Sequence, residues 1–376
     1  MLSLQRSIAS VGLVSGIVGR HYFGSKPLVQ RSLAFDFLPQ YPTWFCNSGH
    51  TSAKVRFLHK LRAHGATEKL AVCPHCGGDK FKLLATQERS GLPTSVLLCL
   101  DCALVFTNPR LSEDFLKDHY IRDYRDIERG SRDDLHEFMF NLQASKGLVL
   151  WEFVQAGGVQ FSDGARFADV GCGEGGLVDW FSKNTGAGKF FGFELNAAAA
   201  EYGRARGIDV RAVEFSSSDG PYDLIVLEQV LEHLASPGDL LATIAASQRT
   251  GAWLYIGVPG ILNFPKGYDH NFIAYLQYGH MFHYCLYTLE RLLIPFGYSL
   301  AKGTDVVQAL FQKVDAPPAA PVTPKVSADT IIQLLQQSEA EFSRRDSQLQ
   351  KEWPYYKDYS KLMMESWRRS FTSLPL

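Results

Sequence analysis

The chain has 376 residues, of which 46% are hydrophobic and 20% are charged, and its formal net charge at pH 7 is −1. Such a composition excludes a chain that is disordered throughout, and the length allows one α/β domain with one or two smaller segments. The near-zero charge disfavours a nucleic-acid-binding protein, whose surface would be basic.

Residues 1–70 form an N-terminal extension with little hydrophobic periodicity and no assigned fold. The first 35 residues contain four basic residues, several serines and no acidic residue, a composition shared by organelle transit peptides, disordered tails and over-extended start sites. The seven cysteines do not resemble a disulfide scaffold and suit a reducing compartment. We expect a cytoplasmic protein, with an organelle matrix as the alternative. No apolar run approaches the roughly 20 residues that span a bilayer, so no transmembrane segment is predicted.

Residues 71–110 carry two C-x-x-C pairs in a short hairpin-like segment. The pairs are Cys73 with Cys76 and Cys99 with Cys102, and 22 residues separate them. This spacing is close to that of a zinc ribbon, in which four thiolates close a tetrahedral shell and leave no open position. We therefore predict a structural Zn²⁺ site. Four free thiols or two local redox pairs are the alternatives.

Residues 111–160 are predicted to form a helical connector, because apolar positions recur among many charged ones. From residue 161 to residue 314 the pattern changes to alternating strands and helices. Buried strands are expected at FADVG, KFFGFEL, IDVRAVEF, YDLIVLEQV and WLYIGVP, with helices between them and a final strand or pair of strands. This alternation predicts a parallel, doubly wound sheet.

Residues 315–326 contain four prolines and are predicted to be a linker. Residues 327–376 form a helical tail. Ser327 is a plausible N-cap, and Ile331, Leu335 and Phe342 share one face, so the tail should begin with an amphipathic helix.

The stretch FADVGCGEGG holds a glycine-rich loop in which Gly171, Gly173 and Gly176 fit the G-x-G-x-x-G spacing. Asp169 lies two residues before the first glycine, where a carboxylate would repel a pyrophosphate and attract an ammonium. The second strand ends in Glu194, which can accept hydrogen bonds from both hydroxyls of a ribose. A ribose joined to a cationic amino acid describes S-adenosyl-L-methionine, so this cofactor is favoured over NAD.

These residues resemble the class I S-adenosylmethionine-dependent methyltransferases. DVGCGEGG matches their first motif, GFEL their acidic second strand, and YDLIVLEQVLEHL their fourth strand and the loop after it. CPHC, CLDCALVFTNPR and GHMFHYCLYTLERLLIPFGY resemble a bacterial subgroup with an N-terminal zinc-binding segment, commonly linked to glycan, lipid or secondary-metabolite modification. The resemblance covers about residues 73–310. It implies a Rossmann-like α/β sheet with a zinc-ribbon-like segment before it and a helical extension after it.

The resemblance also implies roles for single residues in cofactor binding. The backbone of Gly171, Gly173 and Gly175 would approach the methionine part, with Asp169 near its ammonium and Glu194 at the ribose. Glu214 is a weaker candidate near the adenine, and its alternative is an ordinary solvated loop residue. Gln229, at the end of the fourth strand, would face the cofactor or the substrate.

Residues 268–284 are expected to form a substrate lid that follows the fifth strand. Three histidines and five tyrosines occur within residues 268–287, and histidine can act as a base near neutral pH. His280 and His283 are the candidate catalytic residues, and a hydrogen-bonded structural role is the alternative for each.

The predicted function is methyl transfer to a small-molecule, glycan or lipid-linked acceptor, on oxygen or carbon. An RNA methyltransferase and a catalytically silent cofactor-binding protein are the alternatives. The zinc segment lacks the alternation of aromatic and basic residues that stacks RNA bases, so RNA is not favoured.

Overall fold

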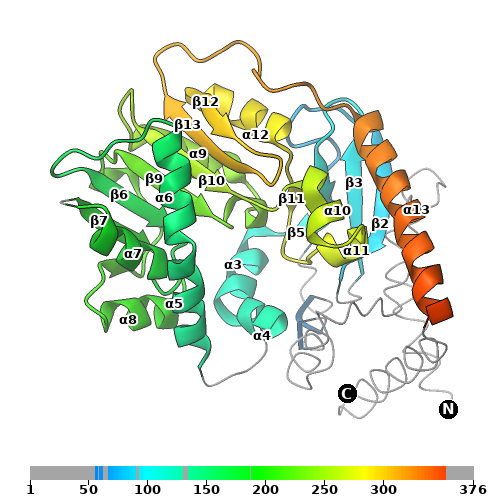
Figure 1. The fold of residues 1–376 in the computed structure, drawn as a ribbon, viewed down its shortest axis with the longest axis horizontal. Helices are drawn as coiled ribbons and strands as arrows, with labels where there is room; N and C mark the ends of the chain where they lie inside the picture. Colours follow the sequence, from blue (N-terminus) through cyan, green and yellow to red (C-terminus); the bar gives the residue numbers. More distant parts are fainter. Residues whose placement is uncertain are drawn as a thin grey trace. The chain divides into compact units, whose positions relative to one another are not determined.

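The computed structural model describes residues 56–57, 59–61, 67–89, 93–129, 134–186 and 188–352. The chain divides into two compact units, and both are discontinuous in sequence. The N-terminal unit comprises Met1–Ser131, Leu262–His283 and Val326–Leu376, and the central unit comprises Arg132–Ile261 and Tyr284–Lys325. The ribbon of Figure 1 shows the elements of both units.

The central unit is built on a seven-stranded sheet with the order β12-β13-β10-β9-β6-β7-β8 (Figure 1). The strands are β6 (Arg166–Val170), β7 (Lys189–Phe193), β8 (Val210–Arg211), β9 (Leu224–Glu228), β10 (Trp253–Gly257), β12 (Tyr298–Gly303) and β13 (Gln308–Lys313). The first five are parallel, whereas β13 is antiparallel to both of its neighbours. The predicted doubly wound α/β sheet and its final strand pair are therefore confirmed.

Strand β8 is shorter than the sequence predicts, since only two of the eight residues in IDVRAVEF are extended and paired. This strand lies at the edge of the sheet and pairs only with β7. An edge strand gains ladder hydrogen bonds on one side only, so alternation of apolar residues alone does not extend it.

Helices and short turns connect the strands of the central unit. They are α5 (Leu135–Ser145), α6 (Gly147–Ala156), α7 (Gly176–Asn184), α8 (Ala197–Arg204), η1 (Ser217–Asp219), η2 (Leu231–His233), α9 (Pro237–Ala246), α12 (Leu286–Leu293) and η4 (Ile294–Phe296). The core joins β6 to α7 through Phe167 and Phe181, whose rings stack with centroids 4.6 Å apart. Both rings are fully buried, and burial of each such side chain is worth about 1.5–3 kcal/mol.

The proline-rich segment that follows β13 forms neither helix nor strand, but it is held against α12. The buried carboxylate of Glu290 accepts hydrogen bonds from the backbone of Val322 (2.7 Å) and from the backbone and hydroxyl of Thr323 (3.0 and 2.7 Å). The segment is therefore anchored to the central unit near its end.

The N-terminal unit contains a four-stranded antiparallel sheet with the order β11-β4-β3-β2. These strands are β2 (Phe81–Gln87), β3 (Pro93–Cys99), β4 (Val105–Thr107) and β11 (Phe282–His283), and a second small sheet pairs β1 (Thr67–Glu68) with β5 (Arg110–Leu111). Among the residues that the structure describes, its helices are α3 (Glu113–Arg122), α4 (Tyr124–Arg129), α10 (Phe264–Gly267), α11 (Phe272–Tyr275) and α13 (Ala328–Glu352); η3 (Ile261–Asn263) spans the point in the sequence where the chain passes from one unit to the other. The predicted hairpin between the cysteine pairs is β2–β3.

Residues 262–283 leave the central unit after β10 and join the sheet of the N-terminal unit. Strand β11 pairs with β4, and the backbone amide of Thr107 donates to the carbonyl of Met281 (2.9 Å). The hydroxyl of Tyr120 donates to the carbonyl of Gly279 (2.9 Å). A two-residue strand with such a distant partner carries no periodic signal, so the sequence does not reveal this pairing.

The amphipathic helix expected in the tail is α13. The Ser327 hydroxyl accepts a hydrogen bond from the amide of Thr330 (3.1 Å), and Ile331, Leu335 and Phe342 are buried. Within the described ranges, none of the helices combines the length and the apolar character needed to cross a bilayer.

Candidate functional site

The glycine-rich loop connects the end of β6 to the start of α7. Gly171, Gly173 and Gly175 have φ angles of 79°, 57° and 81°, a region that residues with a β-carbon rarely adopt. A β-carbon at Gly171 would also lie 2.6 Å from the side chain of Val230. The loop is therefore a tight turn in which Gly171 is exposed and Gly173 and Gly175 are buried.

Glu194 follows β7 and contacts this loop directly. One carboxylate oxygen accepts from the backbone amide of Gly173 (2.8 Å), and the other accepts from the amide of Asn196 (2.7 Å). Each carboxylate oxygen has two lone pairs. Glu194 thus supports the loop with one carboxylate oxygen and Asn196 with the other.

Asp169, near the end of β6, is buried with 3% of its surface exposed. Burial raises the pKa of its carboxyl to about 8, and the nearby carboxylates of Glu228 and Glu194 add to this effect, while Lys146 opposes it. Desolvation and like charge both disfavour the ionised form. A cationic group placed beside Asp169 would therefore relieve an unfavourable concentration of negative charge.

Glu228 and Lys146 complete this cluster, and sequence reasoning missed both. The Lys146 ammonium lies 2.8 Å from a carboxylate oxygen of Glu228, and the Tyr255 hydroxyl donates to the other oxygen (3.3 Å). Glu228 ends β9, so its position at the carboxyl edge of a parallel strand was a usable signal. Lys146 lies at the junction of α5 and α6, and no motif in the sequence marks it.

The other two predicted cofactor residues lie in loops of the same unit. Gln229 follows β9 with a left-handed φ of 61°, and its backbone amide donates to the carbonyl of Gly257 (2.7 Å). A left-handed conformation at a residue other than glycine is uncommon and often marks a functional turn. Glu214 is exposed in the loop after β8.

Glu232, in the turn η2, is a buried carboxyl near the same strand ends. Burial raises its pKa to about 8, and neither of its oxygens has a hydrogen-bond partner among the residues that the structure describes. The imidazole of His233 lies 3.8 Å from one of these oxygens. A buried carboxyl of this kind is neutral in most molecules at pH 7.

The two candidate catalytic histidines lie in the N-terminal unit, at and just before β11. Both are 2% exposed, and their rings have centroids 6.1 Å apart. Burial lowers the pKa of His283 to about 3, and neither of its ring nitrogens has a hydrogen-bond partner within the described part of the chain. With so low a pKa, His283 is neutral and only weakly basic.

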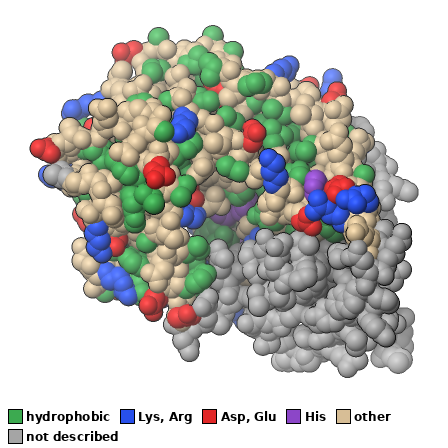
Figure 2. Space-filling model, in the orientation of Figure 1, with side chains coloured by type: hydrophobic (Ala, Val, Ile, Leu, Met, Phe, Trp, Pro, Cys, Tyr) green, Lys and Arg blue, Asp and Glu red, His purple; other side chains and the backbone are tan. Residues whose placement is uncertain are grey.

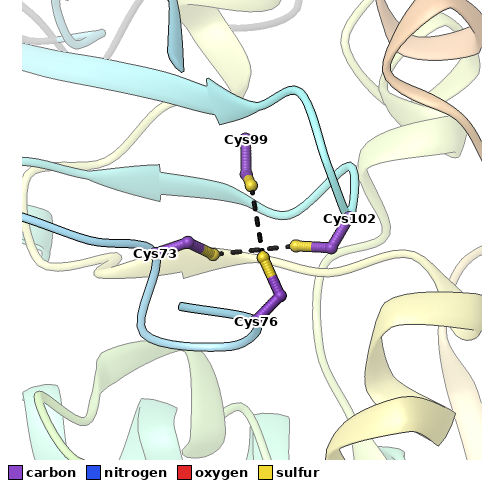
Figure 3. Close-up of side chains that lie close together, drawn as sticks. All are labelled: Cys73, Cys76, Cys99 and Cys102. Carbon is purple, nitrogen blue, oxygen red and sulfur yellow. Dashed lines mark hydrogen bonds between the residues drawn. The ribbon is translucent and has the colours of Figure 1, made fainter. Parts of the chain in front are cut away.

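The four paired cysteines converge at one end of the four-stranded sheet. Figure 3 shows that their sulfur atoms point toward one another. The sulfurs of Cys73 and Cys102 are 3.6 Å apart, those of Cys76 and Cys99 are 3.5 Å apart, and all four lie within 4.8 Å of one another. Four sulfurs at about 2.3 Å from a tetrahedral Zn²⁺ would be separated by about 3.8 Å.

The two cysteine turns have the same local geometry. The amide of Gly77 donates to the carbonyl of Cys73 (2.9 Å), and the amide of Ala103 donates to the carbonyl of Cys99 (3.0 Å). Gly77 and Ala103 both adopt left-handed φ angles, 74° and 62°. Each turn therefore presents its two thiols in the same way, and the donor set fits a tetrahedral metal such as Zn²⁺.

On the face that Figure 2 shows, Lys and Arg side chains are scattered among acidic and apolar ones. They do not gather into a single basic patch on that face. The distribution agrees with the near-neutral charge of the chain and provides no electrostatic footprint for nucleic acid there.

Comparison with known proteins gives matches to methyltransferases. Residues 132–302 match the family model described as a methyltransferase domain. The ubiquinone biosynthesis O-methyltransferase of Burkholderia orbicola (strain MC0-3) is 30% identical over 102 residues, covering 24% of this chain and 43% of that relative. That of Bordetella bronchiseptica is 29% identical over 102 residues, covering 24% and 42%. The chain thus spans less than half the length of these curated relatives.

Two groups of solved structures are also similar to this chain. The plantazolicin methyltransferase BpumL, in complex with SAH and an analogue, has a TM-score of 0.35 at 16% identity, covering 59% of this chain and 84% of that one. Magnesium protoporphyrin IX methyltransferase (ChlM) from Synechocystis PCC 6803, with bound SAH, has a TM-score of 0.36 at 16% identity, covering 53% and 97%.

The matched segment begins just before α5 and ends within β12, so it includes the glycine-rich loop, Glu194 and Glu228. It also contains the five parallel strands of the doubly wound sheet. Residues 132–302 therefore match a methyltransferase domain, in the segment that carries the parallel strands and the glycine-rich loop.

Proposed function

We propose that this protein binds S-adenosylmethionine and transfers its methyl group to an acceptor. One arrangement carries the proposal: a left-handed glycine loop lies beside three carboxylates, Asp169, Glu194 and Glu228, at the carboxyl edge of a parallel sheet. Ligands bind at this edge in doubly wound folds. A cofactor that carries a sulfonium and an ammonium suits such a site better than a pyrophosphate does.

The residue roles follow from these surroundings. Glu194 would accept hydrogen bonds from the ribose hydroxyls, and the backbone of Gly171, Gly173 and Gly175 would approach the methionine part. Asp169 would stabilise the ammonium, which in turn would favour the ionised carboxylate. Gln229 would face the cofactor or the acceptor, with Glu214 in a weaker role near the adenine.

We further propose a structural Zn²⁺ held by Cys73, Cys76, Cys99 and Cys102. The four thiols would fill the coordination shell, so the ion would stabilise the turns that flank β2 and β3 and would leave no position for a reacting group. His280 and His283 remain the candidate catalytic residues of the segment that follows β10.

The acceptor class that we propose is a small molecule, a glycan or a lipid-linked compound, methylated on oxygen or carbon. The curated relatives are named O-methyltransferases of ubiquinone biosynthesis, which supports a small organic acceptor. The near-neutral charge supports the same class.

The experiment that tests cofactor binding is a titration of the purified protein with S-adenosylmethionine and, separately, with NAD. Saturable binding of S-adenosylmethionine without binding of NAD is the expected result. Binding of NAD in preference to S-adenosylmethionine would overturn the proposal. Incubation of a metabolite extract with isotopically labelled methyl donor then identifies the acceptor.

A further inference from the structure

Helix α5 contacts the glycine-rich loop through polar side chains. None of its residues, all of which the structure describes, is fully buried. It nevertheless contacts the carboxylate of Glu174, a loop residue with 0% of its surface exposed. The Nδ1 atom of His136 lies 2.8 Å from one oxygen of this carboxylate, and the side-chain amide of Gln143 donates to the other oxygen (3.0 Å).

Gln143 also contacts the first turn of α7. Its side-chain oxygen accepts a hydrogen bond from the backbone amide of Gly176 (3.1 Å). This amide begins a helix whose N-cap is Gly175, which has no side chain to cap it. A single glutamine therefore satisfies one free amide of α7 and, with its other end, the buried carboxylate of Glu174.

The backbones of α5 and α7 approach closely at the same point. A β-carbon at Gly176 would lie 2.1 Å from the carbonyl oxygen of Phe140. On the other side of α5, the ring of His136 stacks on Tyr202 of α8, with centroids 5.5 Å apart and planes at 25°. Helix α5 therefore contacts both α7 and α8, the helices that follow β6 and β7.

We propose that His136, Gln143, Glu174 and Gly176 form a clasp that holds the glycine-rich loop in its cofactor-binding shape, with Gln143 as the main positioning residue. This inference rests on the proposed function. A loop with several left-handed glycines has many accessible conformations, so ordering it when the cofactor binds costs conformational entropy. A contact from outside the loop that already selects one conformation removes this entropic cost from binding. Without Gln143, the buried carboxylate of Glu174 also loses a hydrogen-bond donor, which disfavours the loop conformation that the clasp holds.

The test measures the affinity of the full-length protein for S-adenosylhomocysteine by calorimetry. If the clasp forms in only part of the molecules, the apparent dissociation constant rises by the inverse of that fraction. For Gln143→Ala we expect an affinity about five to ten times weaker than in the wild type, corresponding to the net contribution of one typical intramolecular hydrogen bond. Gln143→Met, which keeps the side-chain volume, should show the same loss and guards against a packing effect.

Asn141→Ala is the matched control, because Asn141 is an exposed amide two residues away on the same helix. It should keep the wild-type affinity within about twofold, as expected for a surface substitution. Equal losses in Asn141→Ala and Gln143→Ala would show a general effect on α5 and would overturn the proposal. Wild-type affinity in Gln143→Ala and Gln143→Met would overturn it as well.

Hydrogen exchange separates a failure of the clasp from a failure of the proposed function. The Gly176 amide should exchange faster in Gln143→Ala than in the wild type, with or without cofactor, because its acceptor is gone. If the wild type binds no S-adenosylhomocysteine, the proposed function fails, and the Gly176 exchange still decides the clasp. Unchanged exchange at Gly176 would refute the clasp in either case.

Discussion

Glu194 connects the glycine-rich loop to the second strand, so its carboxylate serves the fold and, in our proposal, the cofactor. Its two oxygens accept from the amides of Gly173 and Asn196. Replacement by alanine would remove both supports and the proposed ribose contacts at once. Hydrogen bonds to charged groups contribute about 1.5–3 kcal/mol each.

We therefore predict that Glu194→Ala weakens the affinity for S-adenosylmethionine at least tenfold, a change of about 1.4 kcal/mol. Calorimetry measures it directly. Glu201→Ala is the control, because Glu201 is an exposed carboxylate of the same unit that contacts Arg204. Unchanged affinity in Glu194→Ala would contradict the cofactor assignment.

We predict that Asp169 makes cofactor binding sensitive to pH. Its pKa is raised to about 8 in the cofactor-free protein, chiefly by burial, so its carboxyl is mostly protonated at pH 6.5. A cationic cofactor favours the carboxylate and lowers this pKa, so binding releases protons and the affinity should rise between pH 6 and pH 7.5.

Calorimetry at pH 6.5 in two buffers of different protonation enthalpy measures this proton release. We expect release of up to one proton in the wild type and a clearly smaller release in Asp169→Asn. Equal release in both proteins would show that another group titrates. Because the folded pKa lies above the unfolded value of about 3.9, Asp169 also lowers the stability of the cofactor-free fold progressively as the pH rises between these values.

At the scale of elements, the two cysteine turns flank the strands of the small sheet. One turn precedes the hairpin β2–β3, and the other connects β3 to β4. Cys99 ends β3, and Cys102 lies three residues before β4. The four thiols converge, and Cys76 is exposed whereas Cys73, Cys99 and Cys102 are buried. A metal that binds all four would supply cohesion that so small a sheet gains only in part from apolar burial.

We predict one equivalent of zinc per chain by elemental analysis. Cys99→Ser should lose the zinc and lower the thermal unfolding temperature, while the affinity for S-adenosylmethionine stays within about twofold, because the cofactor residues belong to the other unit. Cys285→Ser is the control, since Cys285 is buried near Thr288 and not in the cluster. A metal-free protein of full stability would contradict the site.

At the scale of the whole molecule, the two units are interleaved along the chain. Residues 262–283 are flanked in sequence by two segments of the central unit, but they complete the sheet of the N-terminal unit. The residues on either side of this segment are hydrogen-bonded to each other, since the amide of Ile261 donates to the carbonyl of Tyr284 (2.9 Å). Cys99 of the cysteine cluster and His283 therefore belong to one sheet, although about 180 residues separate them in sequence.

Removal of the metal should consequently loosen the segment that carries these histidines. We predict that chelation of zinc accelerates hydrogen exchange of residues 276–283, whose backbone is bonded to β4 and Arg89, and leaves α8 unchanged. Mass spectrometry of the exchanged peptides measures both regions. Unchanged exchange at 276–283 after complete zinc removal would contradict this coupling.

The catalytic prediction concerns the same segment. If one histidine is the base, its replacement by alanine should lower turnover about 10²–10⁴-fold with cofactor affinity nearly intact. We expect the larger loss in His280→Ala, because the low pKa of His283 makes it a weak base. Labelled methyl transfer to the acceptor fraction of an extract measures the turnover. Full turnover in both variants would leave the histidines structural, with a tyrosine such as Tyr278 as the next candidate.

The sequence by itself determined the features that depend on local pattern. Alternating apolar runs predicted the doubly wound sheet, the glycine spacing predicted the glycine-rich loop between β6 and α7, and the C-x-x-C spacing predicted the cysteine cluster. The N-cap and apolar face of α13 were likewise readable from neighbouring residues. Each of these signals arises within a few turns or strands of chain, where backbone geometry fixes which side chains share a face.

Only the tertiary structure decided the contacts between distant segments. Lys146 meets Glu228, Gln143 meets Glu174, and residues 262–283 join the sheet that holds the cysteines. These pairs lie 31 or more residues apart and follow no period, so no local pattern encodes them. Burial, which raises the pKa of Asp169 and lowers that of His283, is also a property of the packed molecule, because it depends on the side chains that exclude water around each group.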